Sequence, residues 1–330
     1  MSGATIAGIG AAVPSGTLSS TDLEDSLALP RGWIEARTGI ESRHVAGPAD
    51  TAVTLGTAAA TRALEQADVA ARDVDYVIAA TVTPDFRIPA TASLLQTALG
   101  CEAAAFDLNA GCSGFLCALA QADALVRAGA ASAVLVVGVD LLSRIADFSD
   151  PKSGVLFGDG AGAAVVTQSA TPRLGPFVLH SDGSRPDLLM ASRDGGKIVM
   201  AGREVYRRAV HEMAASVRQA AGAAGVPLRD VDLVVAHQAN RRILEAVAER
   251  LDLPLDKVFT NIARYGNTSS ASIPIALAEA SANGALQRGD RVVLTAFGSG
   301  FVWGAGVVEW TLPAGRVEST GLAEAGAAGV

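Results

Sequence analysis

The stretch Arg72-Asp-Val-Asp-Tyr-Val-Ile-Ala-Ala80 decides the fold, because a close copy returns later as Arg229-Asp-Val-Asp-Leu-Val-Val-Ala-His237. Each copy has a polar turn followed by an apolar run of strand length, and each follows an alanine-rich segment with helical spacing. The two copies start 157 residues apart. Recurrence over that distance predicts two halves built on one plan.

Two further pairs of segments recur in the same order at similar distances. The apolar run Val134–Gly138 corresponds to Val292–Ala296, and Gly160–Val166 corresponds to Gly304–Val308. Strand-like and helix-like segments alternate along the chain, which predicts an α/β protein. Two similar halves packed together leave a cleft between them, and a cleft of this kind is where we expect a binding site.

The repeat also sets the expected domain limits. One half should span residues 1–170 and the other residues 171–312. The remaining tail, residues 313–330, is rich in alanine, glycine and glutamate and has no periodicity. We therefore expect the tail to be disordered.

Composition excludes several classes of protein. The 330 residues are 50% hydrophobic, enough for a large core, and the net charge of −8 argues against a nucleic-acid partner. The longest uncharged apolar run, around Gly129–Val139, is too short to span a bilayer, so no membrane partner is expected. Because the N-terminus lacks the basic start of a secretory signal, we expect a cytoplasmic protein.

The three cysteines form an odd and sparse set. Cys101, Cys112 and Cys117 show no metal-ligand spacing with histidines, so neither a metal site nor a disulfide framework is expected. Cys101 and Cys117 have surroundings typical of packed core residues. Cys112 differs from them.

Cys112 lies in the stretch Asp107–Ala122, between Gly111 and the pair Ser113-Gly114. The apolar spacing that follows predicts a buried helix beginning near Cys112. A thiol at a helix N-terminus feels the positive end of the dipole, which favours the thiolate, and small neighbours let a substrate approach. The local sequence equally allows a small apolar residue in a core helix, so both interpretations stay open.

Two polar residues of the second half are further candidates. His237 ends an apolar strand, which is where functional side chains gather in α/β folds, although a histidine there is more often structural. Asn267 follows a glycine in the stretch Tyr265–Pro274, ahead of serines and a helical segment. Asn267 could belong to an ordinary turn and helix cap, or it could aim an amide donor into the cleft.

Glycine-rich turns give one more candidate. Phe297-Gly-Ser-Gly-Phe-Val-Trp-Gly304 could bare backbone N–H groups for an oxyanion or could simply be packed tightly. The segments Gly8–Pro14 and Gly158–Gly162 lack the features of dinucleotide and phosphate loops, so we interpret both as structural turns.

Together these motifs resemble β-ketoacyl-acyl-carrier-protein synthase III, a family of condensing enzymes with the thiolase fold. The resemblance covers residues 1 to about 310, and its markers are Gly32–Ile40, Ala110–Phe115, Phe157–Gly162, Met200–Val205, His237–Asn240, Gly266–Ser269 and Gly298–Gly304. Each marker alone is weak, but their order and spacing are specific. The resemblance implies a thiolase-like α/β fold, with two βαβαβαββ halves in five layers, α-β-α-β-α.

The resemblance also implies a decarboxylative Claisen condensation. Cys112 would take an acyl group from acyl-CoA and pass it to malonyl-acyl-carrier protein, giving β-ketoacyl-carrier protein at the start of fatty-acid or polyketide synthesis. His237 and Asn267 would donate hydrogen bonds to the enolate. The backbone N–H groups of Cys112 and Ser299 would hold the oxyanion of the first half-reaction.

Binding residues follow from the same resemblance. It implies coenzyme A contacts at Trp33, Arg37 and Asn240, and a carrier-protein contact at Arg242. Ile88 falls where the family caps the acyl pocket of its partner across a homodimer. No cofactor is implied, since acyl-CoA is a substrate.

The sequence departs from the family at two places. Pro151 and Lys152 stand where the family often has an arginine beside the adenine, and the segment Asp182–Met200 is short. These departures leave the acyl donor open. An alternative hypothesis is an acyltransferase of secondary metabolism that passes the acyl group to a hydroxyl, an amine or a carrier.

Overall fold

The first half of the chain forms a mixed five-stranded sheet. This computed structural model describes residues 3–192 and 195–313. The strands, in spatial order, are β1 (Gly3–Ala12), β7 (Asp159–Ser169), β6 (Ala133–Leu141), β4 (Tyr76–Ala80) and β5 (Ala104–Leu108). β4 runs parallel to β5 and β6, whereas β7 is antiparallel to both β1 and β6. The helices between these strands are α3 (Ala52–Ala67), α4 (Thr91–Leu99) and α5 (Gly114–Arg127).

The second half repeats this plan with one strand reduced. Its sheet has the order β11 (Leu233–Ala236), β12 (Arg291–Gly298), β13 (Val302–Glu309) and β8 (Leu174–Ser181). Its main helices are α6 (Gly202–Ala223), α7 (Arg241–Leu251) and α9 (Ser272–Ala282). Where the first half has β5, the second has only a parallel bridge between Val258 and Val234. The apolar segment there is short, because Pro254 and a 3₁₀ turn precede it and Asn261 follows closely.

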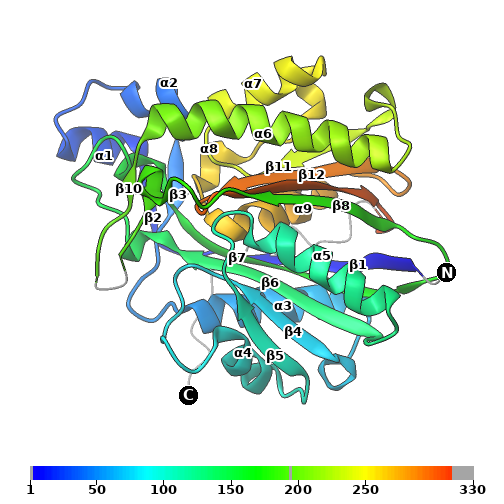
Figure 1. Cartoon of the computed structure of the whole chain (residues 1–330). Helices are drawn as coiled ribbons and strands as arrows, with labels where there is room; N and C mark the ends of the chain where they lie inside the picture. The colour runs from blue at the N-terminus through cyan, green and yellow to red at the C-terminus, as the bar shows by residue number, and fades with distance from the viewer. Residues whose placement is uncertain (1–2, 193–194, 314–330) are drawn as a thin grey trace.

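The two sheets and their helices form five layers, α-β-α-β-α, as Figure 1 shows from α6 and α7 at the top to α3 and α4 at the bottom. Helices α5 and α9 fill the middle layer and contact strands of both sheets. Residues 272–281 of α9 are all buried, as expected for a helix that is covered on every side. The α/β thiolase-like layering predicted from the sequence is confirmed.

The repeated stretch that opened the sequence analysis forms corresponding strands. Tyr76–Ala80 is β4 and Leu233–Ala236 is β11, and each runs parallel to the long strand at the middle of its sheet. Both strands are buried, which explains their continuous apolar runs. His237 directly follows β11, so it lies at the carboxyl end of that strand.

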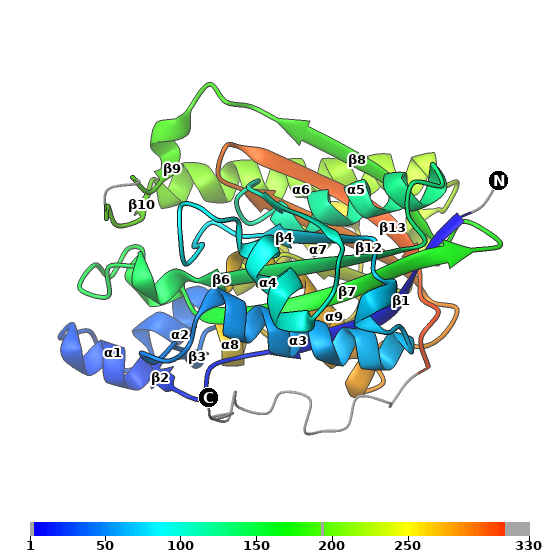
Figure 2. The same cartoon turned by 90° about the horizontal axis from the view of Figure 1, so that it is seen from below.

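Shorter elements gather at one end of the layers, on the left in Figures 1 and 2. They are β2 (Thr17–Ser19), α1 (Ser20–Ser26), α2 (Trp33–Thr38), β3 (Ser42–His44), β9 (Leu189–Met190), β10 (Val199–Met200) and α8 (Ile262–Tyr265). Their apolar side chains form a separate cluster with Leu142 and Phe157. This end of the molecule provides the walls of the site.

Two further sequence predictions concern the C-terminal tail and membrane-spanning segments. The tail predicted at residues 313–330 lies outside the described residues apart from Pro313. Within the described part of the chain, no helix is both long and apolar enough to cross a bilayer.

Candidate active site

A cavity of about 1330 Å³ brings the candidate residues of both halves together. Cys112, His237, Asn267 and Ser299 line it, as do the candidate binding residues Trp33, Arg37, Asn240 and Arg242. Ile88 does not line this cavity, and its side chain is 86% exposed. The chain thus collects a thiol, an imidazole and an amide in one cavity, although they come from distant parts of the sequence.

Cys112 lies in a tight turn just before α5. Gly111 has a φ of +55°, a conformation that favours glycine, and this turn joins the end of β5 to the helix. The next side chain, Ser113, donates a hydrogen bond of 2.8 Å to the carbonyl of Val302 in the second half. The turn that carries the thiol is therefore fixed to both halves.

The turn at Gly298–Gly300 packs directly on the cysteine turn. A Cβ on Gly298 would lie 2.6 Å from the Cys112 nitrogen, and a Cβ on Gly111 would lie 2.8 Å from the Ser299 nitrogen. Only glycine allows so close an approach of two backbones. The backbone nitrogens of Cys112 and Ser299 therefore lie where the two turns meet. A two-donor oxyanion site requires two N–H groups placed close together in this way.

The Cys112 thiol is protonated at neutral pH in this structure. The side chain is only partly exposed, and burial raises its pKa to about 11, with a further upward contribution from the Asp140 carboxylate. Burial thus acts against the effect expected of the helix N-terminus, which favours the thiolate. The thiol must lose its proton as it attacks.

Alkylation of Cys112 by iodoacetamide is expected to accelerate by about tenfold per pH unit between about pH 7 and about pH 10, because only the thiolate reacts. The pKa of about 11 places the whole of this range below the midpoint of titration. Intact-mass spectrometry of the alkylated protein measures the rate. The Cys112→Ala variant shows how much of the alkylation occurs at Cys101 and Cys117. A rate that levels off near neutral pH would show that the thiolate is already formed.

His237 is a buried, neutral imidazole. Its side chain is 2% exposed, and burial lowers its pKa to about 4. Nδ1 lies 2.6 Å from the Ser272 hydroxyl at the first residue of α9. Nε2 is then the ring nitrogen that can form a hydrogen bond with a group in the cavity.

Asn267 has a fixed amide orientation. Its Oδ1 accepts a hydrogen bond of 2.9 Å from the Ser269 backbone nitrogen, and Ser269 adopts a left-handed φ of +49°. Since the oxygen is held by its own loop, the Nδ2 group is the half of the amide that can donate into the cavity.

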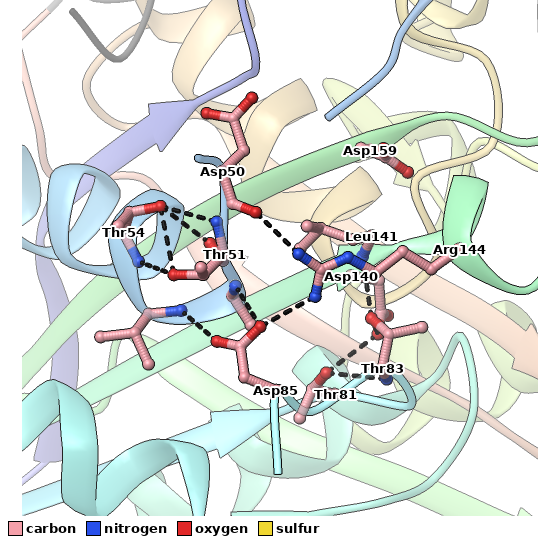
Figure 3. A network of polar contacts seen from close by, with 12 residues as sticks. Asp50, Thr51, Thr54, Thr81, Thr83, Asp85, Asp140, Leu141, Arg144 and Asp159 are labelled. Atoms are coloured by element: carbon pink, nitrogen blue, oxygen red, sulfur yellow. Dashed lines mark hydrogen bonds and ion pairs between the residues drawn. The ribbon is translucent and has the colours of Figure 1, made fainter. Parts of the chain in front are cut away.

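Asp140 ties this loop to the first half. Its carboxylate is fully buried at the end of β6, and Oδ2 accepts a hydrogen bond of 3.0 Å from the Ser270 nitrogen. Oδ1 accepts hydrogen bonds from the Thr81 and Thr83 hydroxyls, which Figure 3 shows in the loop after β4. It also accepts one from the Val82 nitrogen of the same loop. One carboxylate therefore joins the loop that carries Asn267 to the loop after β4.

A second acidic side chain fixes the next part of that loop. Asp85 accepts hydrogen bonds from the Ala52 and Val53 nitrogens at the start of α3 and forms an ion pair of 2.9 Å with Arg144. Figure 3 shows Arg144 reaching from Asp85 to the backbone oxygen of Asp50. Asp85 and Arg144 both line the cavity, so this ion pair forms part of its wall.

Residues of α2 and of the start of α7 form one wall of the cavity. The Arg37 guanidinium stacks on Trp33, with its carbon 4.2 Å from the ring centroid. Asn240 caps α7 by accepting from the Arg242 nitrogen and donates to the carbonyl of Arg37. Arg242 is exposed and donates to the carbonyl of Ala36. The four residues predicted to bind coenzyme A or a carrier protein therefore form one connected group.

Three residues of the site were missed by the sequence analysis. Glu24 is buried and accepts from the Gly32 and Ile34 nitrogens, which fixes α2 and hence Trp33. Asp140 fixes the loop that carries Asn267, and Ser272 contacts the ring of His237. An acidic residue in an apolar strand, such as Asp140 after Val139, was a visible signal, but the partners of Glu24 and Ser272 depend on tertiary contacts.

Among the described residues, no group of three or more histidine, cysteine, aspartate or glutamate side chains could hold a metal ion.

Comparisons with known proteins give a consistent result. The model of the 3-oxoacyl-[acyl-carrier-protein (ACP)] synthase III family matches residues 106–183, and the model of that family's C-terminal part matches residues 222–310. A β-ketoacyl-[acyl-carrier-protein] synthase III from Roseiflexus sp. (strain RS-1) is 45% identical over 324 residues, covering 93% of this chain and 98% of the relative.

Solved structures agree. The 3-oxoacyl-[acyl-carrier-protein] synthase III of Aquifex aeolicus VF5 superposes with a TM-score of 0.90 at 43% identity, covering 93% of this chain and all of that one. The priming β-ketosynthase of the R1128 polyketide biosynthetic pathway gives a TM-score of 0.91 at 35% identity, covering 94% and 97%.

Proposed function

Because the chain belongs to the 3-oxoacyl-[acyl-carrier-protein] synthase III family, we propose that it condenses an acyl group held on Cys112 with malonyl-acyl-carrier protein. The product would be a β-ketoacyl-carrier protein at the start of fatty-acid or polyketide synthesis. The observation that carries the proposal is the cavity shared by Cys112, His237 and Asn267. A condensing enzyme needs a nucleophile for one substrate and hydrogen-bond donors for the enolate of the other.

The first half-reaction is acyl transfer to sulfur. The Cys112 sulfur attacks the thioester carbonyl of acyl-CoA, and the tetrahedral oxyanion accepts hydrogen bonds from the Cys112 and Ser299 nitrogens. The C–S bond to coenzyme A then breaks, and the departing sulfur takes the proton that the Cys112 thiol loses. A thiol with a pKa of about 11 suits a step in which proton loss accompanies attack.

The second half-reaction makes and uses a carbanion. Loss of CO₂ from the malonyl thioester leaves an enolate whose oxygen accepts hydrogen bonds from His237 Nε2 and Asn267 Nδ2. Its carbon attacks the acyl carbonyl on Cys112 and forms the new C–C bond. The C–S bond to Cys112 then breaks, and the sulfur takes a proton from solvent to become the thiol again. His237 with a pKa of about 4 is neutral at physiological pH, so it acts here as a hydrogen-bond donor.

The direct test uses the purified chain with a panel of acyl-CoA donors and malonyl-carrier protein. We expect an acyl adduct on Cys112 by intact-mass spectrometry, release of CO₂, and a carrier-bound β-ketoacyl product. An acyl adduct that is never consumed by malonyl-carrier protein would contradict the proposal. Transfer to alcohols or amines without CO₂ release would instead favour an acyltransferase of secondary metabolism.

The connected group of Trp33, Arg37, Asn240 and Arg242 is proposed to flank the entrance for coenzyme A and for the carrier's phosphopantetheine arm. Basic side chains surround the cavity, namely Arg37, Arg87, Arg144, Lys152, Arg203 and Arg242. They contrast with the net charge of −8 for the whole chain and suit a phosphorylated substrate. Arg242 is the proposed contact for the acidic carrier protein, whereas Pro151 offers the adenine no planar cation to stack on.

The chain is proposed to act as a homodimer in the cytoplasm. Among the described strands, β5 is at the edge of its sheet and pairs only with β4, and Phe106 on it is 37% exposed. In the nearby loop, Phe86 and Ile88 are 57% and 86% exposed. An unpaired edge beside exposed apolar side chains suits pairing with a second copy, whose acyl pocket Ile88 would then close.

Phe106→Glu is expected to convert the dimer into a monomer at micromolar concentration, because it puts a charge on the edge strand. Light scattering coupled to size-exclusion chromatography measures the mass. Leu255→Glu is the matched control, since Leu255 is 53% exposed in a 3₁₀ turn of the other half and should leave the mass unchanged. A Phe106→Glu protein with the mass of the unmodified chain would argue against this interface.

A further inference from the structure

The proton position on His237 can be deduced from its surroundings. Nδ1 of His237 and the Ser272 hydroxyl lie 2.6 Å apart, and both residues are 2% exposed. Two arrangements fit this distance. Either the hydroxyl donates to an unprotonated Nδ1, or a protonated Nδ1 donates to the hydroxyl oxygen.

The hydrogen-bond inventory distinguishes the two arrangements. In the described part of the chain, His237 is the one side-chain hydrogen-bond partner of the Ser272 hydroxyl. If Nδ1 donated, the hydroxyl proton would lie buried without an acceptor, which is costly. If the hydroxyl donates, its proton is satisfied and the neutral ring carries its own proton on Nε2.

The elements on each side make this contact rigid. Ser272 is the first residue of α9, which lies in the middle layer and has nearly all its residues buried. His237 directly follows β11, and its backbone nitrogen donates a 2.8 Å hydrogen bond to the Thr295 carbonyl of β12. Neither partner can move away from the other without disturbing the core.

We propose that Ser272 is a positioning residue that fixes the proton of His237 on Nε2. The ring then always presents a donor to the cavity, as the enolate oxygen of the condensation requires. The inference rests on the proposed function for the role of that donor, but the proton position itself is a property of the folded chain alone.

The first test is spectroscopic. In protein labelled with ¹⁵N-histidine, the ring nitrogens of His237 report which one is protonated, and His237→Ala identifies their signals among those of the four histidines. We expect the Nε2–H form in the unmodified protein and a mixture of both forms in Ser272→Ala. An Nδ1–H form in the unmodified protein would overturn the proposal without any variant.

The second test separates the half-reactions. In Ser272→Ala we expect the release of CO₂ from malonyl-carrier protein to slow by about tenfold, the size expected when one neutral hydrogen bond that selects a proton position is lost. The rate of Cys112 acylation by acyl-CoA should stay the same, which also shows that the variant is folded. Unchanged CO₂ release together with an unchanged spectrum would refute the role of Ser272.

Ser281→Ala is the matched control. Ser281 lies on the same helix, is fully buried, and its hydroxyl has no hydrogen-bond partner within the described chain. It should change neither the spectrum nor the rates, so a loss equal to that of Ser272→Ala would point to packing and contradict the proposal. If the unmodified protein shows the Nε2–H form but releases no CO₂, the proposed function fails while the deduced proton position stands.

Discussion

Cys112→Ala is expected to abolish condensation, with a loss on the order of 10⁶-fold, the size measured when the nucleophile of other covalent enzymes is removed. The acyl group cannot be stored without the sulfur, and no other cysteine lines the cavity among the described residues. Formation of the carrier-bound β-ketoacyl product, followed by mass spectrometry, measures the loss.

The same variant should keep its decarboxylase activity. His237 and Asn267 are both intact in Cys112→Ala, so malonyl-carrier protein should still release CO₂. Cys117→Ala is the control, because Cys117 lies on α5 but does not line the cavity. An acyl adduct in Cys112→Ala that goes on to product would mean that another group is the nucleophile.

Asn267→Asp is expected to lower the release of CO₂ by about 10³-fold, toward the upper end of losses measured for single oxyanion donors. The carboxylate can still accept from the Ser269 nitrogen, so the loop geometry is retained. The substitution replaces the Nδ2 donor with a negative charge beside the enolate. This charge destabilises the enolate more than simple removal of the donor would. Acylation of Cys112 should continue, and intact-mass spectrometry checks it.

Asn283→Asp provides the comparison for this change. Asn283 is at the C-terminal end of α9, outside the cavity, so the same substitution there should leave CO₂ release unchanged. An Asn267→Asp protein as fast as the Asn283→Asp control would remove Asn267 from the mechanism.

The fold could be predicted because similar segments recur along the sequence and strand-like runs alternate with helix-like runs. The copies at Arg72–Ala80 and Arg229–His237 became corresponding strands, and the alternation of strands and helices gave the layers. The weakened strand at Val258 could not be foreseen, because whether a short apolar segment pairs fully depends on its neighbours in the sheet.

Residue types predicted the contents of the cavity but not their protonation. The glycine-rich turn indicated Cys112, and the position at a strand end indicated His237. The pKa values of both depend on burial, which the linear sequence does not give: burial keeps the thiol protonated and the imidazole neutral. The roles of Glu24, Asp140 and Ser272 depend on contacts between residues distant in the sequence.

The contact between Gly298 and Cys112 has a consequence for how such enzymes diversify. The turns that carry Gly111 and Gly298 pack closely beside Cys112, so a side chain added at either glycine would displace the cysteine turn. Other parts of the cavity wall are apolar side chains, such as Leu142, Leu189 and Ile198. Libraries that seek new acyl donors should therefore vary these apolar side chains and leave both glycine turns unchanged.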